Sequence, residues 1–292
     1  MPNQAPLNSI KLIECPRDAM QGLPEFVPTE LKAAYINTLL KVGFDTIDFG
    51  SFVSPKAIPQ MRDTAAVLDQ LDLSDTRSEL LAIVANARGA EDAVQFDPIS
   101  YLGFPFSVSE TFQRRNTNSG IEDSLHRVEA IQNLCQQHQK KLVVYLSMAF
   151  GNPYGDPWSS DVVCKWAERL SSDFGVTILA PSDTIGSSTP DNIQEIFSTL
   201  IQELPDIEFG AHLHTTPDSW EEKIQAVLES GCRRIDGALK GFGGCPMAKD
   251  ELTGNMPIEN VVEYLEQNNI ETGLDKAALL HALQISTRVF GS

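Results

Sequence analysis

The 292-residue sequence predicts an α/β protein, a (β/α)8 (TIM) barrel with extra helices at its C-terminus. Three observations support this fold class. Short β-rich apolar runs recur eight times along the chain, segments with helical periodicity lie between most of them, and no Pro/Gly-rich linker or composition break divides the chain. We therefore expect residues 1–292 to form a single barrel domain rather than a doubly wound sheet.

The expected strands are brief apolar runs such as "KLVVYLSM", and the third and fourth strand–helix units are the least regular. The strands cover residues 9–14, 44–49, 80–85, 93–99, 141–148, 175–180, 206–214 and 233–239. Helical periodicity, often preceded by a Thr, Ser or Pro in a capping position, covers 29–42, 121–139, 159–173, 190–203 and 217–230. Residues 257–267 and 275–289 supply the terminal helices.

The composition of the chain argues against several classes of partner and compartment. The formal net charge of -18 argues against a nucleic-acid partner or an anionic membrane surface, both of which select a basic protein. Five scattered cysteines without a C-x-x-C pair favour reduced thiols over a disulfide framework. The N-terminus resembles neither a signal peptide nor a transit peptide, and no run reaches membrane-spanning length, so we expect a cytoplasmic protein.

Chemically capable side chains follow the expected strands at the end where barrels carry their active sites. Arg17 and Asp18 come directly after the first strand, in "IECPRDAMQG". The seventh strand ends in "AHLH", and strand alternation would point His212 and His214 to the same side. With Asn255, from the loop after the eighth strand, Asp18 and the two histidines could bind an octahedral Mg²⁺ or Mn²⁺.

Each of these patterns also has a purely structural interpretation. Neighbouring Arg and Asp residues are more often a surface charge pair, and an H-x-H pattern is as often two hydrogen-bonded core histidines as two ligands. The loop "GFGGCP" could be only a tight turn in which Cys245 is a small buried filler. The combination of these features at one end of the barrel is what indicates a site.

The chain resembles hydroxymethylglutaryl-CoA lyase, a metal-dependent barrel lyase with an Arg-Asp signature on its first strand. The resemblance covers nearly the whole chain and keeps the family order. The matching stretches are "PRDAMQ" (16–21), "SFVSPKAIPQM" (51–61), "SDTIGSSTP" (182–190), "AHLH" (211–214), "GFGGCP" (241–246) and "TGN" (253–255).

The resemblance implies a role for each of these stretches. It implies that Asp18, His212, His214 and Asn255 hold the divalent metal, that Arg17, Asp48, Asp183 and Cys245 serve catalysis, and that Gln21, Ser51 and Lys56 contact substrate. The implied partner is an acyl-CoA, and the implied assembly is a homodimer or a larger homo-oligomer. The implied reaction is retro-Claisen cleavage of a 3-hydroxyacyl-CoA to a ketoacid and acetyl-CoA. Asp183 or a bound water would remove the hydroxyl proton, and Cys245 would help to protonate the enolate.

The chain departs from the family pattern at several positions. Ala19 and Thr215 replace the usual Gly and Asp, and Asp48 stands where Glu is usual. Pro24 lies in the loop where a lysine is expected, and Val143 stands where the family often has arginine. Two other functions therefore remain open: a related aldolase or Claisen synthase, and a non-catalytic relative that binds a small acid.

Overall fold

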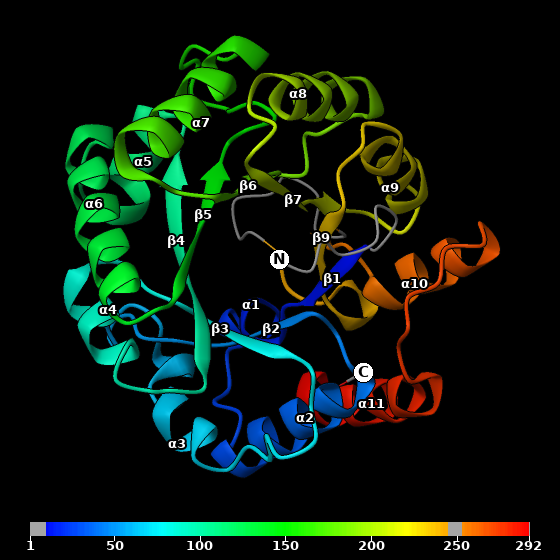
Figure 1. Ribbon diagram of the computed structural model, residues 1–292. Helices are drawn as coiled ribbons and strands as arrows, with labels where there is room; N and C mark the ends of the chain where they lie inside the picture. The colour runs from blue at the N-terminus through cyan, green and yellow to red at the C-terminus, as the bar shows by residue number, and fades with distance from the viewer. Residues whose placement is uncertain (1–9, 245–252, 292) are drawn as a thin grey trace, which may run out of the picture.

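The computed structural model describes residues 10–244 and 253–291. Eight parallel strands close into a barrel in the order β1-β2-β3-β4-β5-β6-β7-β9, with helices around the outside (Figure 1). This confirms the predicted fold class. The barrel strands are β1 (Lys11–Glu14), β2 (Thr46–Ser51), β3 (Glu79–Ile83), β4 (Ile99–Ser107), β5 (Lys141–Ser147), β6 (Ile178–Ser182), β7 (Glu208–His212) and β9 (Arg234–Gly237).

The helices agree well with the periodicity of the sequence. They are α1 (Pro16–Gln21), α2 (Thr29–Val42), α3 (Thr64–Leu68), α4 (Ala87–Ala93), α5 (Glu110–Thr117), α6 (Ile121–Gln137), α7 (Ser160–Phe174), α8 (Pro190–Glu203), α9 (Trp220–Glu229), α10 (Ile258–Gln267) and α11 (Lys276–Phe290). Short 3₁₀ turns cover Pro59–Met61 and Leu239–Gly241. The capping signals explain α8, which begins at Pro190 after a capping box between Thr189 and Asn192.

The prediction of the fourth strand was wrong. Residues 93–99 hold the end of α4 and a turn, and the strand is β4, which begins at Ile99. The side chain of Asn86 caps α4 by accepting a hydrogen bond from Gly89 N. Gly103 and Pro105 disguise β4 in the sequence, because both residues are uncommon inside strands. The barrel interior favours glycine at position 103, since a Cβ would come within 2.4 Å of Ile83 Cδ1 and 3.0 Å of Tyr145 Cε2.

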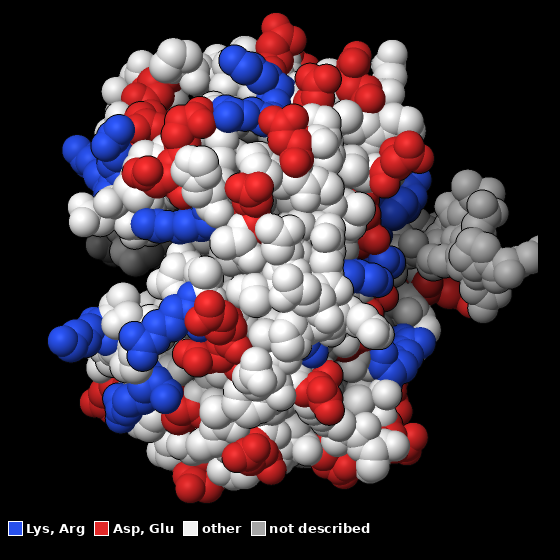
Figure 2. All heavy atoms as spheres, turned by 60° about the vertical axis from the view of Figure 1, so that its left-hand side comes forward, with Lys and Arg blue, Asp and Glu red and all other residues white. Residues whose placement is uncertain are grey.

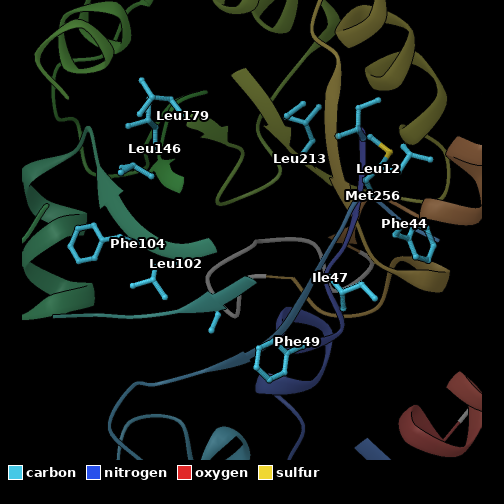
Figure 3. Packing of buried hydrophobic residues seen from close by; sticks show 14 of the residues in the cluster. Leu12, Phe44, Ile47, Phe49, Leu102, Phe104, Leu146, Leu179, Leu213 and Met256 are labelled. Carbon is cyan, nitrogen blue, oxygen red and sulfur yellow. The ribbon is translucent and has the colours of Figure 1, made fainter. Parts of the chain in front are cut away.

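Two apolar layers stabilise the barrel. Outward-facing strand residues such as Leu12, Ile47 and Leu179 belong to the large core between the strands and the helices (Figure 3). A smaller cluster fills the inside of the barrel and consists of Leu81, Ile83, Tyr101, Val143, Tyr145, Ile178 and Ala180. Complete burial of one large apolar side chain contributes roughly 1.5–3 kcal/mol, so the two layers give a rigid frame for polar groups at the strand ends.

The seventh strand does not continue to His214 as predicted. β7 ends at His212, and a separate short strand, β8 (His214–Thr215), pairs antiparallel with β10 (Gly254–Asn255). This pairing sets Asn255 opposite His214. Gly254 permits the close approach, because a Cβ there would lie 2.2 Å from Gly241 O.

The surface carries charges of both signs. On the face that Figure 2 shows, acidic and basic side chains are interspersed. In the part of the chain that the structure describes, no helix combines the length and apolarity needed to span a bilayer.

Candidate active site at the C-terminal end of the barrel

Arg17 lies in the first turn of α1, the short helix that follows β1 at once, and not on the strand itself. Its guanidinium is buried and reaches across to Asp48 on β2. Arg17 Nε donates to both carboxylate oxygens of Asp48 at 3.1 and 3.0 Å, and Nη2 donates to Oδ2 at 2.5 Å. The orientation of the arginine is therefore set by a multidentate pair.

Burial and charge act in opposite directions on this pair. Burial lowers the pKa of Arg17, but the charges of Asp48 and Asp18 outweigh it, so the net pKa is raised and the guanidinium stays charged. Burial raises the pKa of Asp48 to about 6, and the charge and hydrogen bonds of Arg17 only partly oppose that shift. A proton on Asp48 would weaken the contact that holds Arg17.

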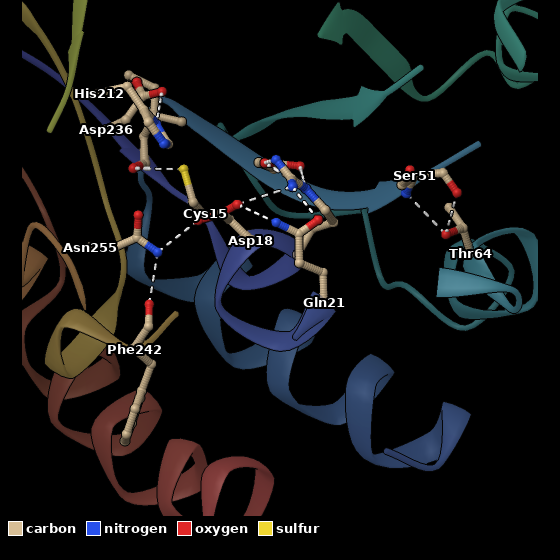
Figure 4. A network of polar contacts seen from close by, with 12 residues as sticks. Cys15, Asp18, Gln21, Ser51, Thr64, His212, Asp236, Phe242 and Asn255 are labelled. Atoms are coloured by element: carbon tan, nitrogen blue, oxygen red, sulfur yellow. Dashed lines mark hydrogen bonds and ion pairs between the residues drawn. The ribbon is translucent and has the colours of Figure 1, made fainter. Parts of the chain in front are cut away.

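Gln21, one turn further along α1, ties Arg17 to Asp18. Its Nε2 donates to Asp18 Oδ1 at 2.7 Å, and its Oε1 accepts from Arg17 Nη1 at 3.0 Å. Arg17 Nη1 also lies 3.1 Å from Asp18 Oδ1. The i, i+3 and i, i+4 spacing of a helix produces this closed triangle (Figure 4).

Asp18, His212 and His214 form a group that could hold a metal ion. One donor atom from each lies within 4.8 Å of the other two. Asn255 Nδ2 donates to Asp18 Oδ2 and to Phe242 O, both at 2.8 Å, which leaves its Oδ1 available as a ligand. A carboxylate, two imidazoles and an amide oxygen suit a divalent cation of intermediate hardness, so the four residues fit the predicted metal.

The pKa shifts of Asp18 and His214 favour the forms in which these side chains bind metals. Burial raises the pKa of Asp18, but the charges of Arg17, His212 and His214 and the Asn255 hydrogen bond more than offset it, and the net pKa is lowered. Burial and the neighbouring His212 lower the pKa of His214. Burial lowers the pKa of His212, but the hydrogen bond and charge of Asp236 outweigh it and the net pKa is raised, so a metal ion would compete with a proton for this imidazole.

Asp236 supports His212 from behind, and the sequence reasoning missed it. Asp236 Oδ2 lies 3.2 Å from His212 Nδ1, and the carboxylate is buried on β9 (Figure 4). With a carboxylate oxygen as the acceptor of this contact, Nδ1 is the donor, and Nε2 is the ring nitrogen left to face a metal ion. The signal was an acidic residue inside the apolar run "RRIDGAL".

Asp183 lies at the end of β6, where it organises the following loop. Ser187 N donates to its Oδ1 at 2.7 Å, and its Oδ2 accepts from Ser188 Oγ at 2.5 Å and Ser188 N at 3.1 Å. Buried Lys223 on α9 donates to Asp183 Oδ2 at 3.1 Å and to His214 O at 2.8 Å. No local pattern singled out Lys223, because its neighbours read only as an amphipathic helix.

The model of the HMGL-like family matches residues 10–285. The chain belongs to the HMGL-like family. It is 33% identical to hydroxymethylglutaryl-CoA lyase of Bacillus subtilis, over 91% of this chain and 88% of that protein. It is 32% identical to the 3-hydroxy-3-isohexenylglutaryl-CoA/hydroxymethylglutaryl-CoA lyase of Pseudomonas aeruginosa, over 97% and 93% respectively.

A solved structure agrees with this assignment. The hydroxymethylglutaryl-CoA lyase of Acinetobacter baumannii, in complex with coenzyme A and 3-methylmalate, superimposes with a TM-score of 0.89 and 29% sequence identity. The match covers 99% of this chain and 93% of the other.

The remaining predicted site residues of this HMGL-like protein lie further from the metal group or outside the described residues. Ser51 ends β2 with its Oγ buried and without a hydrogen-bond partner among the described residues. Lys56 is exposed in the loop that follows β2. Cys245 falls outside the described residues. Its neighbour Gly243 lies against α1, where a Cβ would be 2.8 Å from Ala19 Cα and from Asn255 Nδ2.

Val143 is not at the mouth of the site. It is completely buried inside the barrel, in the cluster that contains Tyr101, Tyr145 and Ile178. A basic side chain at this position would therefore begin inside the barrel, whereas Pro24 is exposed beyond α1.

Proposed function

We propose that this protein is a divalent-metal-dependent carbon–carbon lyase that cleaves 3-hydroxy-3-methylglutaryl-CoA, or a close 3-hydroxyacyl-CoA, to acetoacetate or its analogue and acetyl-CoA. The observation that carries the proposal is the convergence of Arg17 with Asp18, His212, His214 and Asn255 at one end of the barrel. The names of the similar proteins supply the reaction and the substrate class.

Asp18, His212, His214 and Asn255 would hold the ion, for which we propose Mg²⁺ or Mn²⁺ because both accept mixed oxygen and nitrogen ligands and keep open positions. Bound there, the ion would lower the pKa of the substrate's 3-hydroxyl group.

In the proposed cleavage, the 3-hydroxyl loses its proton, a C=O bond forms at C3, and the C2–C3 bond breaks. The electron pair of that bond becomes a thioester enolate. Arg17, fixed in position by Asp48 and Gln21, would stabilise the negative charge on the enolate oxygen. Because these contacts orient the guanidinium before substrate binds, little reorganisation is needed during the reaction.

Two proton transfers complete the reaction. We propose Asp183, or a water molecule in the site, as the acceptor of the hydroxyl proton. Among the described residues, four hydrogen bonds hold the Asp183 carboxylate, three of them on Oδ2, so Oδ1 keeps the greater capacity to accept. Cys245, which directly follows Gly244 in the sequence, is the proposed donor to the enolate carbon. Cys245→Ser should lower kcat by about 10²-fold with little change in metal affinity, and an unchanged kcat would exclude that role.

The deciding assay is release of acetyl-CoA from 3-hydroxy-3-methylglutaryl-CoA by metal-loaded enzyme, compared with a substrate that has a longer apolar branch at C3 and with one that lacks the distal carboxylate. Cleavage of none of the three, with condensation of acetyl-CoA onto a ketoacid instead, would favour the Claisen synthase alternative. Metal binding without turnover of any thioester would favour the non-catalytic relative.

We also propose a cytoplasmic protein that forms a homodimer or a larger homo-oligomer. The net charge of -18 argues against nucleic acid or an anionic membrane as partner, and the names of the similar proteins supply an acyl-CoA as the substrate class. Size-exclusion chromatography with light scattering tests the oligomeric state, and a purely monomeric mass would contradict it.

A further inference from the structure

A row of alternating charges begins with the partly exposed Lys11 and Glu208, at the starts of β1 and β7, and ends at the candidate metal group. Lys11 Nζ lies 2.7 Å from Glu208 Oε2, and Arg234 Nη1 donates to Glu208 Oε1 at 3.4 Å. Arg234 Nε lies 3.9 Å from Asp236 Oδ1, and Asp236 Oδ2 contacts His212 Nδ1 at 3.2 Å. These residues come from three adjacent strands, β1, β7 and β9.

Arg234 is the unusual member of this row. Its side chain is 1% exposed, and Nε and Nη2 have no hydrogen-bond partner among the described residues. Burial of an arginine with unsatisfied donors costs several kcal/mol, and Arg234 lies beside the mainly apolar cluster that contains Tyr101, so a compensating role is expected. Burial lowers the pKa of Arg234, but the charge of Asp236 outweighs it and the net pKa is raised, so the residue remains a cation.

The barrel provides space for this arginine at a defined place. Gly210, its neighbour on β7, would bring a Cβ within 2.9 Å of Arg234 Cδ. The guanidinium lies 5.9 Å from the centre of the Tyr101 ring, at the edge of cation–π range. The aliphatic part of the side chain is thus confined between β7 and Tyr101. The guanidinium lies between two carboxylates, Glu208 at the start of β7 and Asp236 on β9.

Asp236 is the residue on which this cation can act. Its Oδ2 is used by His212, whereas its Oδ1 is buried without a hydrogen-bond partner among the described residues and faces Arg234 Nε. Rotation of the carboxylate would break the contact with His212 Nδ1. A fixed cation on the opposite side of Asp236 opposes that rotation, directly or through a water that satisfies both orphaned groups.

We propose that Arg234 is a positioning residue that acts through Asp236 to hold His212 with its Nδ1 protonated and its Nε2 directed at the metal. The inference rests on the proposed metal-dependent function. In this arrangement Arg234 restrains Asp236, and Asp236 in turn restrains the ligand His212. Arg234 touches no reacting atom.

The test measures Mn²⁺ affinity of the metal-free protein by electron paramagnetic resonance, without substrate. Removal of a carboxylate behind a ligand histidine commonly weakens metal binding by about 10–100-fold, which we expect for Asp236→Asn. Arg234→Met keeps the apolar stem and should weaken binding by about 10-fold, with partial recovery in Arg234→Lys. The matched control is Arg233→Met, since exposed Arg233 donates, within the described part of the chain, to the backbone oxygens of Leu228 and Cys232.

A double-mutant cycle shows whether Arg234 acts through Asp236. If it does, Arg234→Met should have little further effect on Mn²⁺ affinity once Asp236 is Asn. Long-range ¹H–¹⁵N spectra of the metal-free protein should show a mixture of His212 tautomers in Arg234→Met and one tautomer in the wild type. If Arg234→Met does not fold, Gly210→Ala displaces the stem while retaining the charge and should weaken binding in the same direction.

Equal Mn²⁺ affinity in wild type, Arg234→Met and Gly210→Ala would overturn the inference and leave the proposed lyase intact. Fully additive losses in the cycle would also overturn it, because Arg234 would then act independently of Asp236. A wild type that binds no Mn²⁺ or Mg²⁺ would instead overturn the proposed function.

Discussion

Two buried pairs of a basic residue with a carboxylate support the candidate site in different ways. Arg17 and Asp48 are joined by three contacts of 2.5–3.1 Å. His212 and Asp236 share a single contact of 3.2 Å. The first pair is self-sufficient, because several hydrogen bonds restrict the guanidinium to one plane. The second pair leaves one carboxylate oxygen without a partner among the described residues, so its geometry depends on groups behind it.

The difference between the two pairs corresponds to the roles proposed for Arg17 and His212. Arg17 must meet a charge that develops only during cleavage, and a rigid, preformed orientation stabilises such a charge most. His212 would be held in front by the ion and needs support from behind mainly when the ion is absent. The comparison therefore predicts that disruption of each pair affects a different step.

The largest expected effect is loss of the metal group itself. Treatment with a chelator should reduce acetyl-CoA release to background, and Mg²⁺ or Mn²⁺ should restore it. A His212→Ala/His214→Ala variant should show no restoration and no stoichiometric metal by elemental analysis. Full activity in verified metal-free wild type would falsify the metal assignment, and exposed His281→Ala is the matched control.

The next largest effect should come from Arg17→Gln. Removal of one electrostatic stabiliser of an enolate should lower kcat by about 10²–10³-fold, while Mn²⁺ affinity changes little. Loss of the cation also leaves Asp48 buried without its partner, so part of the effect could be instability. Asp48→Asn/Arg17→Gln removes that charge and separates the two causes. A Km increase with unchanged kcat would contradict the proposed role.

The pH dependence should distinguish the first pair from the second. The raised pKa of Asp48, about 6, means that Asp48 gains a proton below that pH and loosens its hold on Arg17. kcat/KM should therefore fall by about fivefold between pH 6 and pH 5, since the ionised fraction of a group with this pKa drops from about one half to about one tenth. In Asp48→Asn, activity should be lower throughout and this acid limb should be absent. An unchanged limb in that variant would assign it to another group.

Protonation of Asp48 should lower activity but raise the stability of the folded protein. A folded-state pKa above the unfolded value means that the folded protein retains the proton as pH rises from about 4 to about 6. Ionisation of Asp48 in that window should therefore reduce the free energy of unfolding of the wild type relative to Asp48→Asn. The difference between the two denaturation curves across this window should shrink as pH falls to 4, and a constant difference would contradict the raised pKa.

The smallest expected effect on activity comes from Val143→Arg. Because Val143 is completely buried in the cluster that contains Tyr101, the new arginine would crowd a filled interior and add a second cation near Arg234. We expect a loss of stability of about 1–3 kcal/mol or more and no gain in affinity for hydroxymethylglutaryl-CoA. Combination with Arg234→Val should recover part of the stability. Improved affinity in the single variant would instead show that position 143 selects the substrate.

Some features could be predicted from local sequence because their physical causes are local. Helices such as α8 follow from the spacing of apolar residues and from the Thr189 and Pro190 start signals. Arg17 and Asp18 could be placed at the end of the first strand because an apolar run ends there. β4 could not be recognised, because Gly103 is favoured only by the crowded barrel interior around it.

The sequence by itself determined the eight-strand barrel, its amphipathic helices and the candidate ligands near the strand ends, since periodicity, caps and residue chemistry are properties of short segments. Only the tertiary structure decided how these groups meet. Asn255 reaches Asp18 across 237 positions because β10 pairs with β8, and β7 stops at His212 to allow that pairing. The contacts that Asp236, Lys223 and Arg234 make likewise depend on barrel closure, which brings distant strands and helices within hydrogen-bond range and excludes water from between them.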